Sequence, residues 1–147
     1  MTTVITTHFD EFAQALQAPL ATDGVEATPL AHLEAMAQAY VEWALARPGH
    51  YRVLFSGTNA GPTGLGLDDE TAHPGAPTFR ALVSAVSACF PADAGDVAVL
   101  STATELWASL HGIVDLRITK PEIPWPDPPT LIDHALAAVR AQQQSPT

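Results

Sequence analysis

The stretch ELWASLHGIVDLRI, residues 105–118, places an ionisable ring and a carboxylate in what otherwise reads as a buried helix. His111 and Asp115 are four residues apart, so their side chains are neighbours on a helix. Such a pair has the composition of a general base or of two metal ligands. No third ligand occurs at matching spacing, so we expect no metal site. His111 then either lines a pocket as a polar contact or is a core histidine with one hydrogen bond.

Other reactive residue types lack the pattern that their chemistry requires. The acidic segment LDDETAH, residues 67–73, fits no calcium or zinc spacing and is typical of a solvated loop. Ser56 and Ser109 lack the flanking turn of a nucleophile elbow. Cys89 is the single cysteine and has no internal disulfide partner. We therefore predict a protein that is not an enzyme and that uses no metal and no cofactor.

Length and charge restrict the class of protein further. The 147 residues fit one domain, 1–147, and their 47% hydrophobic content is typical of a globular chain. Six Lys and Arg against sixteen Asp and Glu leave a net charge of -10. Such a surface repels phosphates, so we expect no direct nucleic-acid binding. The sequence starts without a signal-peptide pattern, and we find no run long enough to span a bilayer, so we expect a cytoplasmic protein without membrane contact.

Apolar residues recur at helical spacing along most of the chain, and no segment has a convincing strand pattern. We predict an all-α bundle of about six helices, at residues 7–20, 29–47, 48–57, 78–90, 93–118 and 130–144. Thr28 is the predicted cap of the second helix, which ends before Pro48. Residues 57–78, rich in Gly and Pro, are predicted to be a loop more mobile than the helices and able to gate a pocket. A stiff proline-rich connector is expected at 119–129.

The helix at 93–118 has two apolar stripes, which predict deep burial, and a third side of small residues. Gly112 on that third side costs about 1 kcal/mol relative to Ala in a helix interior, which suggests that another helix approaches closely. The last helix has a similar face. Together these faces predict an isologous homodimer interface. Its predicted residues are Ala108, Ser109, Gly112, Leu131, His134, Ala135 and Ala138.

Two segments in a fixed order carry a resemblance to a known family. AYVEWALARPGHYRVLFSG, residues 39–57, is followed about fifty residues later by ELWASLHGIVDL, residues 105–116. This pair resembles the C-terminal ligand-binding domain of TetR-family transcriptional regulators, in the subgroup named for a Trp, His and Gly motif. Here the motif falls on Trp107, His111 and Gly112. The resemblance extends over most of the chain, from Thr7 to Gln143.

The resemblance implies an all-helical domain in which the last two long helices of each subunit form a four-helix dimer interface. It also implies a mostly apolar pocket that binds an inducer. Regulators of this family begin with a three-helix DNA-binding domain that contains a helix-turn-helix, and this sequence has no counterpart of it. DNA contact is therefore expected from an N-terminal domain of the parent regulator and not from this chain.

The family arrangement places five helices around the pocket, and their apolar stripes supply the predicted effector-binding residues. These are Phe12, Met36, Tyr40, Phe55, Phe79, Val83, Trp107 and His111. We predict that the chain senses a small, largely apolar or aromatic effector and dimerises. Two alternatives stay open at this point. One is a small helical enzyme that uses His111 and Asp115 as a general base pair, and the other is a dimerisation module with a filled core.

Overall fold

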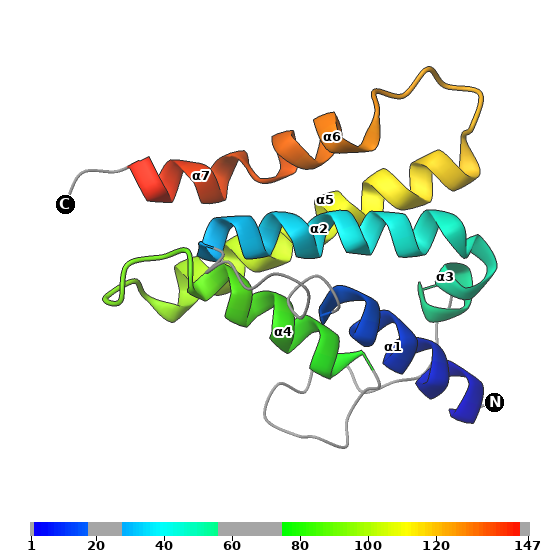
Figure 1. Ribbon diagram of the computed structural model, residues 1–147, viewed down its shortest axis with the longest axis horizontal. Coiled ribbons are helices and arrows are strands. Elements are labelled where there is room, and N and C mark those ends of the chain that lie inside the picture. Colours follow the sequence, from blue (N-terminus) through cyan, green and yellow to red (C-terminus); the bar gives the residue numbers. More distant parts are fainter. Residues whose placement is uncertain (1, 18–27, 56–74, 145–147) are drawn as a thin grey trace.

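Two long helices, α2 (Pro29–Ala46) and α5 (Asp96–Thr119), run along the molecule, and shorter helices pack against them (Figure 1). The computed structural model describes residues 2–17, 28–55 and 75–144. The shorter helices are α1 (Thr2–Gln17), α3 (Pro48–Phe55), α4 (Ala76–Ser87), α6 (Pro128–Ala135) and α7 (Ala137–Gln144). These described residues form seven helices and no strand, which confirms the predicted all-α class.

Local sequence signals explain where α2 begins and ends. The Thr28 hydroxyl accepts a hydrogen bond from the Ala31 backbone N–H at 3.2 Å, and Pro29 occupies the first helical turn. At the other end Arg47 leaves helical geometry, with φ −133° and ψ 61°, because the residue before Pro48 avoids the helical region. Both predicted ends of this helix are therefore confirmed. In contrast, α1 starts at Thr2 and not at residue 7.

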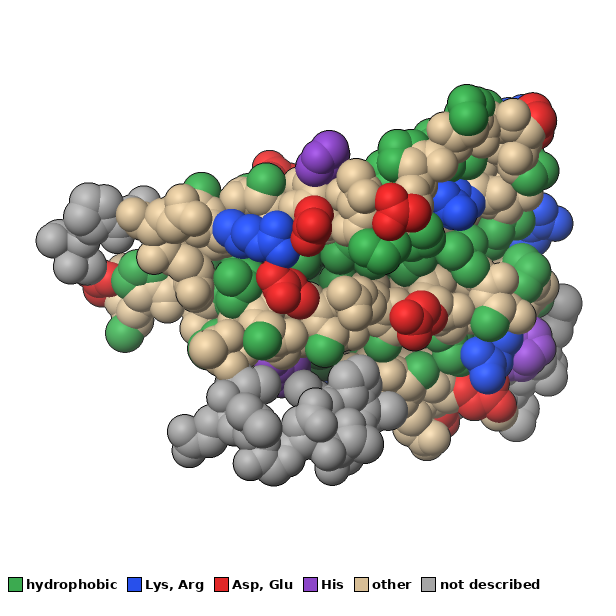
Figure 2. All heavy atoms as spheres, turned by 45° about the horizontal axis from the view of Figure 1, so that its top comes forward, with side chains coloured by type: hydrophobic (Ala, Val, Ile, Leu, Met, Phe, Trp, Pro, Cys, Tyr) green, Lys and Arg blue, Asp and Glu red, His purple; other side chains and the backbone are tan. Residues whose placement is uncertain are grey.

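Charged and hydrophobic side chains share the surface. On the face drawn in Figure 2, basic side chains lie next to acidic ones rather than in one continuous patch. Hydrophobic side chains form a band along the middle of the same face (Figure 2).

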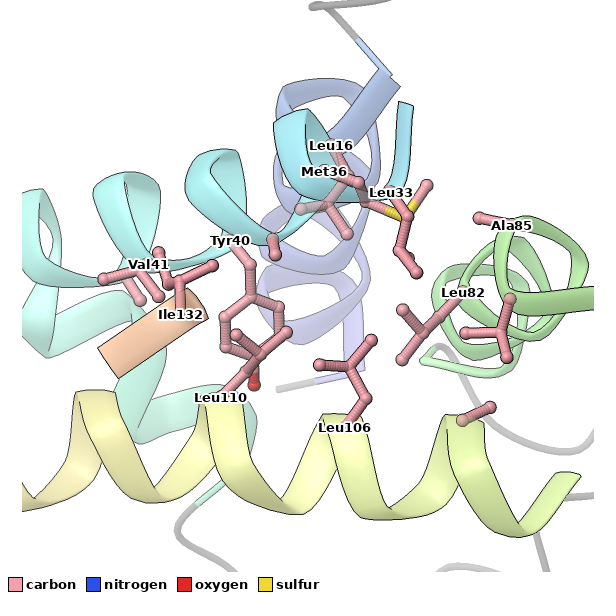
Figure 3. Close-up of a cluster of buried hydrophobic side chains, with 14 of the residues drawn as sticks. Leu16, Leu33, Met36, Tyr40, Val41, Leu82, Ala85, Leu106, Leu110 and Ile132 are labelled. Atoms are coloured by element: carbon pink, nitrogen blue, oxygen red, sulfur yellow. The ribbon is translucent and has the colours of Figure 1, made fainter. Parts of the chain in front are cut away.

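The core lies between α1, α2, α4 and α5 (Figure 3). Leu33 and Met36 on α2 meet Leu82 on α4, while Leu106 and Leu110 rise from α5 beneath them. Each is at least 94% buried, and full burial of a side chain of this size contributes roughly 1.5–3 kcal/mol. These contacts hold α2 and α5 at a fixed distance and so position the side chains that they carry.

Only one stripe of α5 is fully buried. Its members are Val99, Ala103, Leu106, Leu110 and Val114. The prediction of two deeply buried stripes was wrong, because α2, α4 and α6 cover this helix on one side only. On the second stripe Leu100 is 39% exposed, and Trp107 and His111 are half-buried.

Helix α5 is also long and apolar enough, by length and composition alone, to cross a membrane. This finding corrects the expectation that no run reaches that length. Core helices of globular proteins pass the same test, and α5 supplies Leu106 and Leu110 to the core. A single helix of this kind is weak support for a membrane span.

The predicted last helix is divided into α6 and α7 at Leu136. Leu136 has φ −88° and ψ −2°, which opens the helix for one residue. Backbone hydrogen bonds continue across the break, from Leu136 N–H to the Ile132 carbonyl and from Arg140 N–H to the Leu136 carbonyl, both at 3.0 Å. The two helices therefore follow nearly the same direction in Figure 1.

Polar contacts fix the C-terminal segment to the rest of the chain. In the predicted stiff connector, the Trp125 indole N–H donates to the Lys120 carbonyl and Arg117 donates to the Pro126 carbonyl, both at 2.8 Å. Arg140 on α7 pairs with Glu34 on α2 at 2.6 Å. Helix α4 begins at Ala76, and residues 57–74 of the predicted loop, with its expected mobility and gating, lie outside the described residues.

Candidate functional site

Aromatic rings from five helices meet in one contiguous cluster beside the core. Phe12 of α1 contacts Tyr40 of α2 with ring centroids 4.9 Å apart. Phe55 of α3 lies 5.2 Å from His111 of α5, measured between ring centroids. Phe79 of α4 completes the cluster through Trp107, at 5.5 Å. Such edge-to-face and tilted pairs stabilise a packed arrangement beyond simple burial.

A chain of hydrogen bonds runs through this apolar cluster. The Tyr40 and Tyr51 hydroxyls are 2.7 Å apart, and the Tyr51 hydroxyl lies 2.6 Å from His111 Nδ1. Tyr40 is 4% exposed and Tyr51 only 1%. Each buried hydroxyl thus has the partner that an apolar environment requires. Three helices, α2, α3 and α5, are joined by these two bonds.

The direction of the chain follows from Tyr40, whose hydroxyl is almost fully buried. Among the described residues, the Tyr51 hydroxyl is the only acceptor within reach of the Tyr40 O–H. Both buried O–H groups are used when Tyr40 donates to Tyr51 and Tyr51 donates to His111 Nδ1, whereas the reverse direction would leave the Tyr40 O–H without an acceptor. In this arrangement His111 carries its proton on Nε2, which directs one donor away from the tyrosines. Among the described residues, Nε2 has no hydrogen-bond partner.

Both tyrosines stay neutral phenols at neutral pH. Burial raises the pKa of Tyr40 to about 12, although its hydrogen bonds with Tyr51 and Trp107 oppose the change. Burial raises the pKa of Tyr51 as well, and the neighbouring Tyr40 adds to the effect. Neither hydroxyl is therefore activated as a base or nucleophile. Their role in this geometry is to hold His111 in one tautomer and orientation.

His111 and Asp115 are not joined in the way that the general-base alternative requires. His111 Nδ1 is bonded to Tyr51, and Asp115 is an exposed residue of the same helix. A carboxylate that orients a histidine base normally accepts the ring N–H that faces away from the reacting atom. No hydrogen bond of this kind joins the two among the described side chains. The geometry favours a recognition group over a base.

The predicted effector-binding residues differ in burial. Phe12, Met36, Tyr40 and Phe79 are buried, whereas Phe55, Val83, Trp107 and His111 are half-buried. Six of the eight are linked by ring contacts. Met36 and Val83 pack against the same core without ring contacts.

The sequence-based selection missed Tyr51, which lies at the centre of the hydrogen-bond chain. Its signal was present, because Tyr51 and the selected Phe55 are four residues apart and share a helix face. Phe9 and Trp43 also join the cluster, through Phe55 at 6.0 Å and Phe12 at 4.8 Å. These residues extend the aromatic wall toward the N-terminal half of α1.

A separate shallow cleft of about 280 Å³ lies between the end of α1, the start of α2 and α4. Met36 is the one predicted effector-binding residue that lines it, together with small side chains such as Ala81, Ser84 and Ala85. The rings of the aromatic cluster do not line this cleft. It is therefore distinct from the surroundings of His111.

The predicted dimer residues lie on the outer surface of α5, α6 and α7. Ala108, Ser109, His134 and Ala138 are exposed, while Gly112, Leu131 and Ala135 are half-buried. A Cβ atom added at Gly112 would meet nothing within 4 Å in the described chain. Packing inside one subunit therefore gives no reason for a glycine at this position.

The exposed face of α5 has few unsatisfied polar groups. The hydroxyls of Thr104, Ser109 and Thr119 each donate to the backbone carbonyl four residues earlier, at 2.7 to 2.9 Å. Leu100 and Leu116 on the same side are 39% and 44% exposed. Small side chains, satisfied hydroxyls and exposed leucines together make a face that another helix can cover without trapping unpaired polar atoms.

Comparison with known families bears directly on this arrangement. A family model described as tetracyclin repressor-like, C-terminal domain, matches residues 33–139, which include α2 from Leu33, all of α3 to α6 and α7 up to Val139. The chain belongs to this family. No curated protein and no solved structure matched the chain.

Tetracyclin repressor-like C-terminal domains in general bind small molecules and form dimers. Tyr40, Tyr51 and His111 all lie inside the matched range. So do Gly112 and the exposed face of α5. Phe12 on α1 lies outside it, so the part of the aromatic cluster on α1 is described by the structure alone.

Proposed function

We propose that this chain is the ligand-sensing and dimerisation domain of a TetR-like transcriptional regulator. Family membership over residues 33–139 supports a regulatory role. The single observation that carries the ligand-sensing proposal is the Tyr40–Tyr51–His111 hydrogen-bond chain, which leaves His111 Nε2–H as a donor for a ligand. Small-molecule sites typically combine apolar walls with a few placed polar groups of this kind.

The effector in this proposal is a small, largely apolar or aromatic molecule with one hydrogen-bond acceptor. It would lie against the half-buried side chains of Phe55, Val83, Trp107 and His111. The acceptor would bind His111 Nε2–H, because the tyrosine chain holds Nδ1 as an acceptor. A molecule with only donor groups at that position would leave Nε2–H unpaired and bind more weakly.

The dimer in this proposal uses the exposed face of α5 with α6 and α7. Gly112 would permit close approach of the partner helix, and Leu100 and Leu116 would become buried. Effector binding would change the relation between the two subunits, which requires that the effector bind the two arrangements with different affinities. DNA would be contacted by an N-terminal domain of the parent regulator in the cytoplasm.

A ligand screen tests the effector-binding half of the proposal. The chain is mixed with apolar and aromatic compounds, half with a hydrogen-bond acceptor and half with the acceptor removed, and its melting temperature is recorded. We expect hits among the acceptor compounds, and weaker binding of these hits to His111→Phe than to the wild type. A control, Gln38→Phe, adds a ring on the exposed side of α2, outside both proposed surfaces, and should leave binding unchanged.

The outcomes distinguish the alternatives. Binding without chemical change of the compound, lost in His111→Phe, supports the effector site. Conversion of a bound compound would instead favour the small helical enzyme. Compounds that bind His111→Phe as tightly as they bind the wild type would refute the role of His111. If no compound binds, only the dimerisation module with a filled core would remain.

A further inference from the structure

Three potential metal ligands from two helices come together away from the aromatic cluster's hydrogen-bond chain. His8 and Glu11 lie one turn apart on α1, and His50 lies on α3. Their ligand atoms all lie within 4.8 Å of one another. His8 Nδ1 is 3.5 Å from a Glu11 carboxylate oxygen, and the His8 and His50 rings stack with centroids 4.1 Å apart.

The burial of these groups suits a site that opens to solvent. The His8 side chain is 16% exposed, so the protein holds it in place, whereas Glu11 is 48% exposed and His50 is an exposed residue. An ion can therefore enter from water and keep water molecules as further ligands. A chain with a net charge of -10 also attracts cations to its surface.

An ordinary surface ion pair explains this arrangement less well. The His8–Glu11 contact of 3.5 Å is at the outer limit of a hydrogen bond, and it involves only one of the two imidazoles. His50 makes ring contacts with His8 and Trp43 but no hydrogen bond with another described residue. The two adjacent imidazoles and the carboxylate that they face are all good ligands for the same class of metal ion.

The donor set indicates which ions fit. Two imidazole nitrogens and one carboxylate oxygen suit zinc, cobalt and nickel, while calcium and magnesium prefer oxygen donors alone. Ligand atoms about 2.0–2.2 Å from a zinc ion lie roughly 3.3 Å from one another. The ring stack must therefore turn edge-on, and atoms up to 4.8 Å apart must close by up to about 1.5 Å, which the exposed Glu11 and His50 side chains can supply by rotation.

We propose that His8, Glu11 and His50 form a binding site for a divalent transition-metal ion of the zinc, cobalt or nickel class, which links α1 to α3. Water completes the coordination. His8 precedes Phe9 on α1, and His50 precedes Tyr51 on α3. Phe9 and Tyr51 both belong to the aromatic cluster, so the ion would hold together two helices that contribute to it. The site does not depend on the proposed effector or on dimerisation.

The test uses the full chain without an affinity tag, stripped of metal with a chelator. Cobalt ions alone are titrated in while the visible absorbance and the binding heat are recorded, and zinc ions are then added in competition. We expect one ion per chain with a micromolar dissociation constant, and zinc displacing cobalt. His50→Ala should weaken binding at least tenfold, and so should Glu11→Gln.

Matched controls keep the result clear of folding effects. Glu42→Gln and Asp93→Asn change exposed carboxylates elsewhere and should bind metal as the wild type does. Because His50 is exposed, His50→Ala should keep the melting temperature of the metal-free protein. Binding only at millimolar metal, or equal binding by His50→Ala and wild type, would overturn the proposal. Neither result would affect the effector screen, which is run in the presence of chelator.

Discussion

Tyr51 is the residue on which the polar chain depends, because it both accepts from Tyr40 and donates to His111. A Tyr51→Phe substitution keeps the ring but leaves the Tyr40 O–H and His111 Nδ1 without their partner. Leaving buried polar groups unsatisfied typically costs about 1–3 kcal/mol. We expect this loss in the free energy of unfolding, measured by urea denaturation.

The matched variant is Tyr40→Phe, which removes the hydroxyl that donates to Tyr51 but lets Tyr51 keep donating to His111. It should destabilise the chain less than Tyr51→Phe does. The double variant should cost less than the sum of the two, by about 0.5 kcal/mol or more, because both changes break the same bond. Additive costs would contradict a connected chain.

The two tyrosines also predict an unusual alkaline titration. They are the only tyrosines in the sequence, and burial raises the pKa of both, that of Tyr40 to about 12. The folded state therefore binds more protons than the unfolded state above pH 10, so stability is full below pH 10 and falls as the pH rises toward 12. For Tyr40 alone the loss approaches about 3 kcal/mol.

Tyrosinate absorbance measured against pH checks this expectation. No tyrosine signal should appear with a midpoint near the ordinary value of 10, and the signal should instead rise together with the loss of helical circular dichroism. Unfolded chain in denaturant serves as the control and should titrate normally. Half of the signal appearing near pH 10 in folded protein would show that one of the two hydroxyls is accessible.

At the scale of helices, Gly112 separates packing inside one subunit from packing between subunits. A side chain placed there meets nothing within 4 Å in the described chain, so Gly112→Ala should stabilise an isolated subunit by up to about 1 kcal/mol through helix propensity. Gly112→Leu should still fold. In the proposed dimer, however, overpacking costs roughly 1–3 kcal/mol in each subunit, which weakens association by about 30-fold or more.

Sedimentation velocity over a range of concentrations measures the effect, with circular dichroism as the check on folding. A matched control is Ser87→Leu on the exposed side of α4, which lies outside the proposed interface. It should leave the dimer intact. If Gly112→Leu and wild type sediment alike, the interface must use another face of the chain.

At the scale of the whole molecule, charge predicts how the chain meets DNA. Its net charge of -10 repels phosphates, and on the face in Figure 2 the basic side chains are interspersed with acidic ones. We expect the isolated chain to form a dimer that fails to shift duplex DNA in a gel, even at low salt, where electrostatic attraction would be strongest. Tight binding that weakens as salt is added would disprove the assignment of DNA contact to another domain.

Several features of the fold followed from near neighbours in the sequence. The Thr28 cap, the end of α2 before Pro48 and the helical period of the apolar residues depend on contacts within about one helical turn. These signals determined the all-α class, and the ordered pair of segments at 39–57 and 105–116 pointed to the family whose model matches residues 33–139. They also selected six aromatic or histidine residues that the structure brings into one cluster.

Other features were decided only when the helices packed. The Tyr51 hydroxyl reaches Tyr40 and His111 because α2, α3 and α5 meet at one point, and His8 reaches His50 because α3 folds back on α1. The one-sided burial of α5 likewise depends on which neighbours cover that helix. The helical period of the sequence determines which side chains share a face. The rotation and crossing of the helices determine which atoms come within hydrogen-bonding or metal-binding distance.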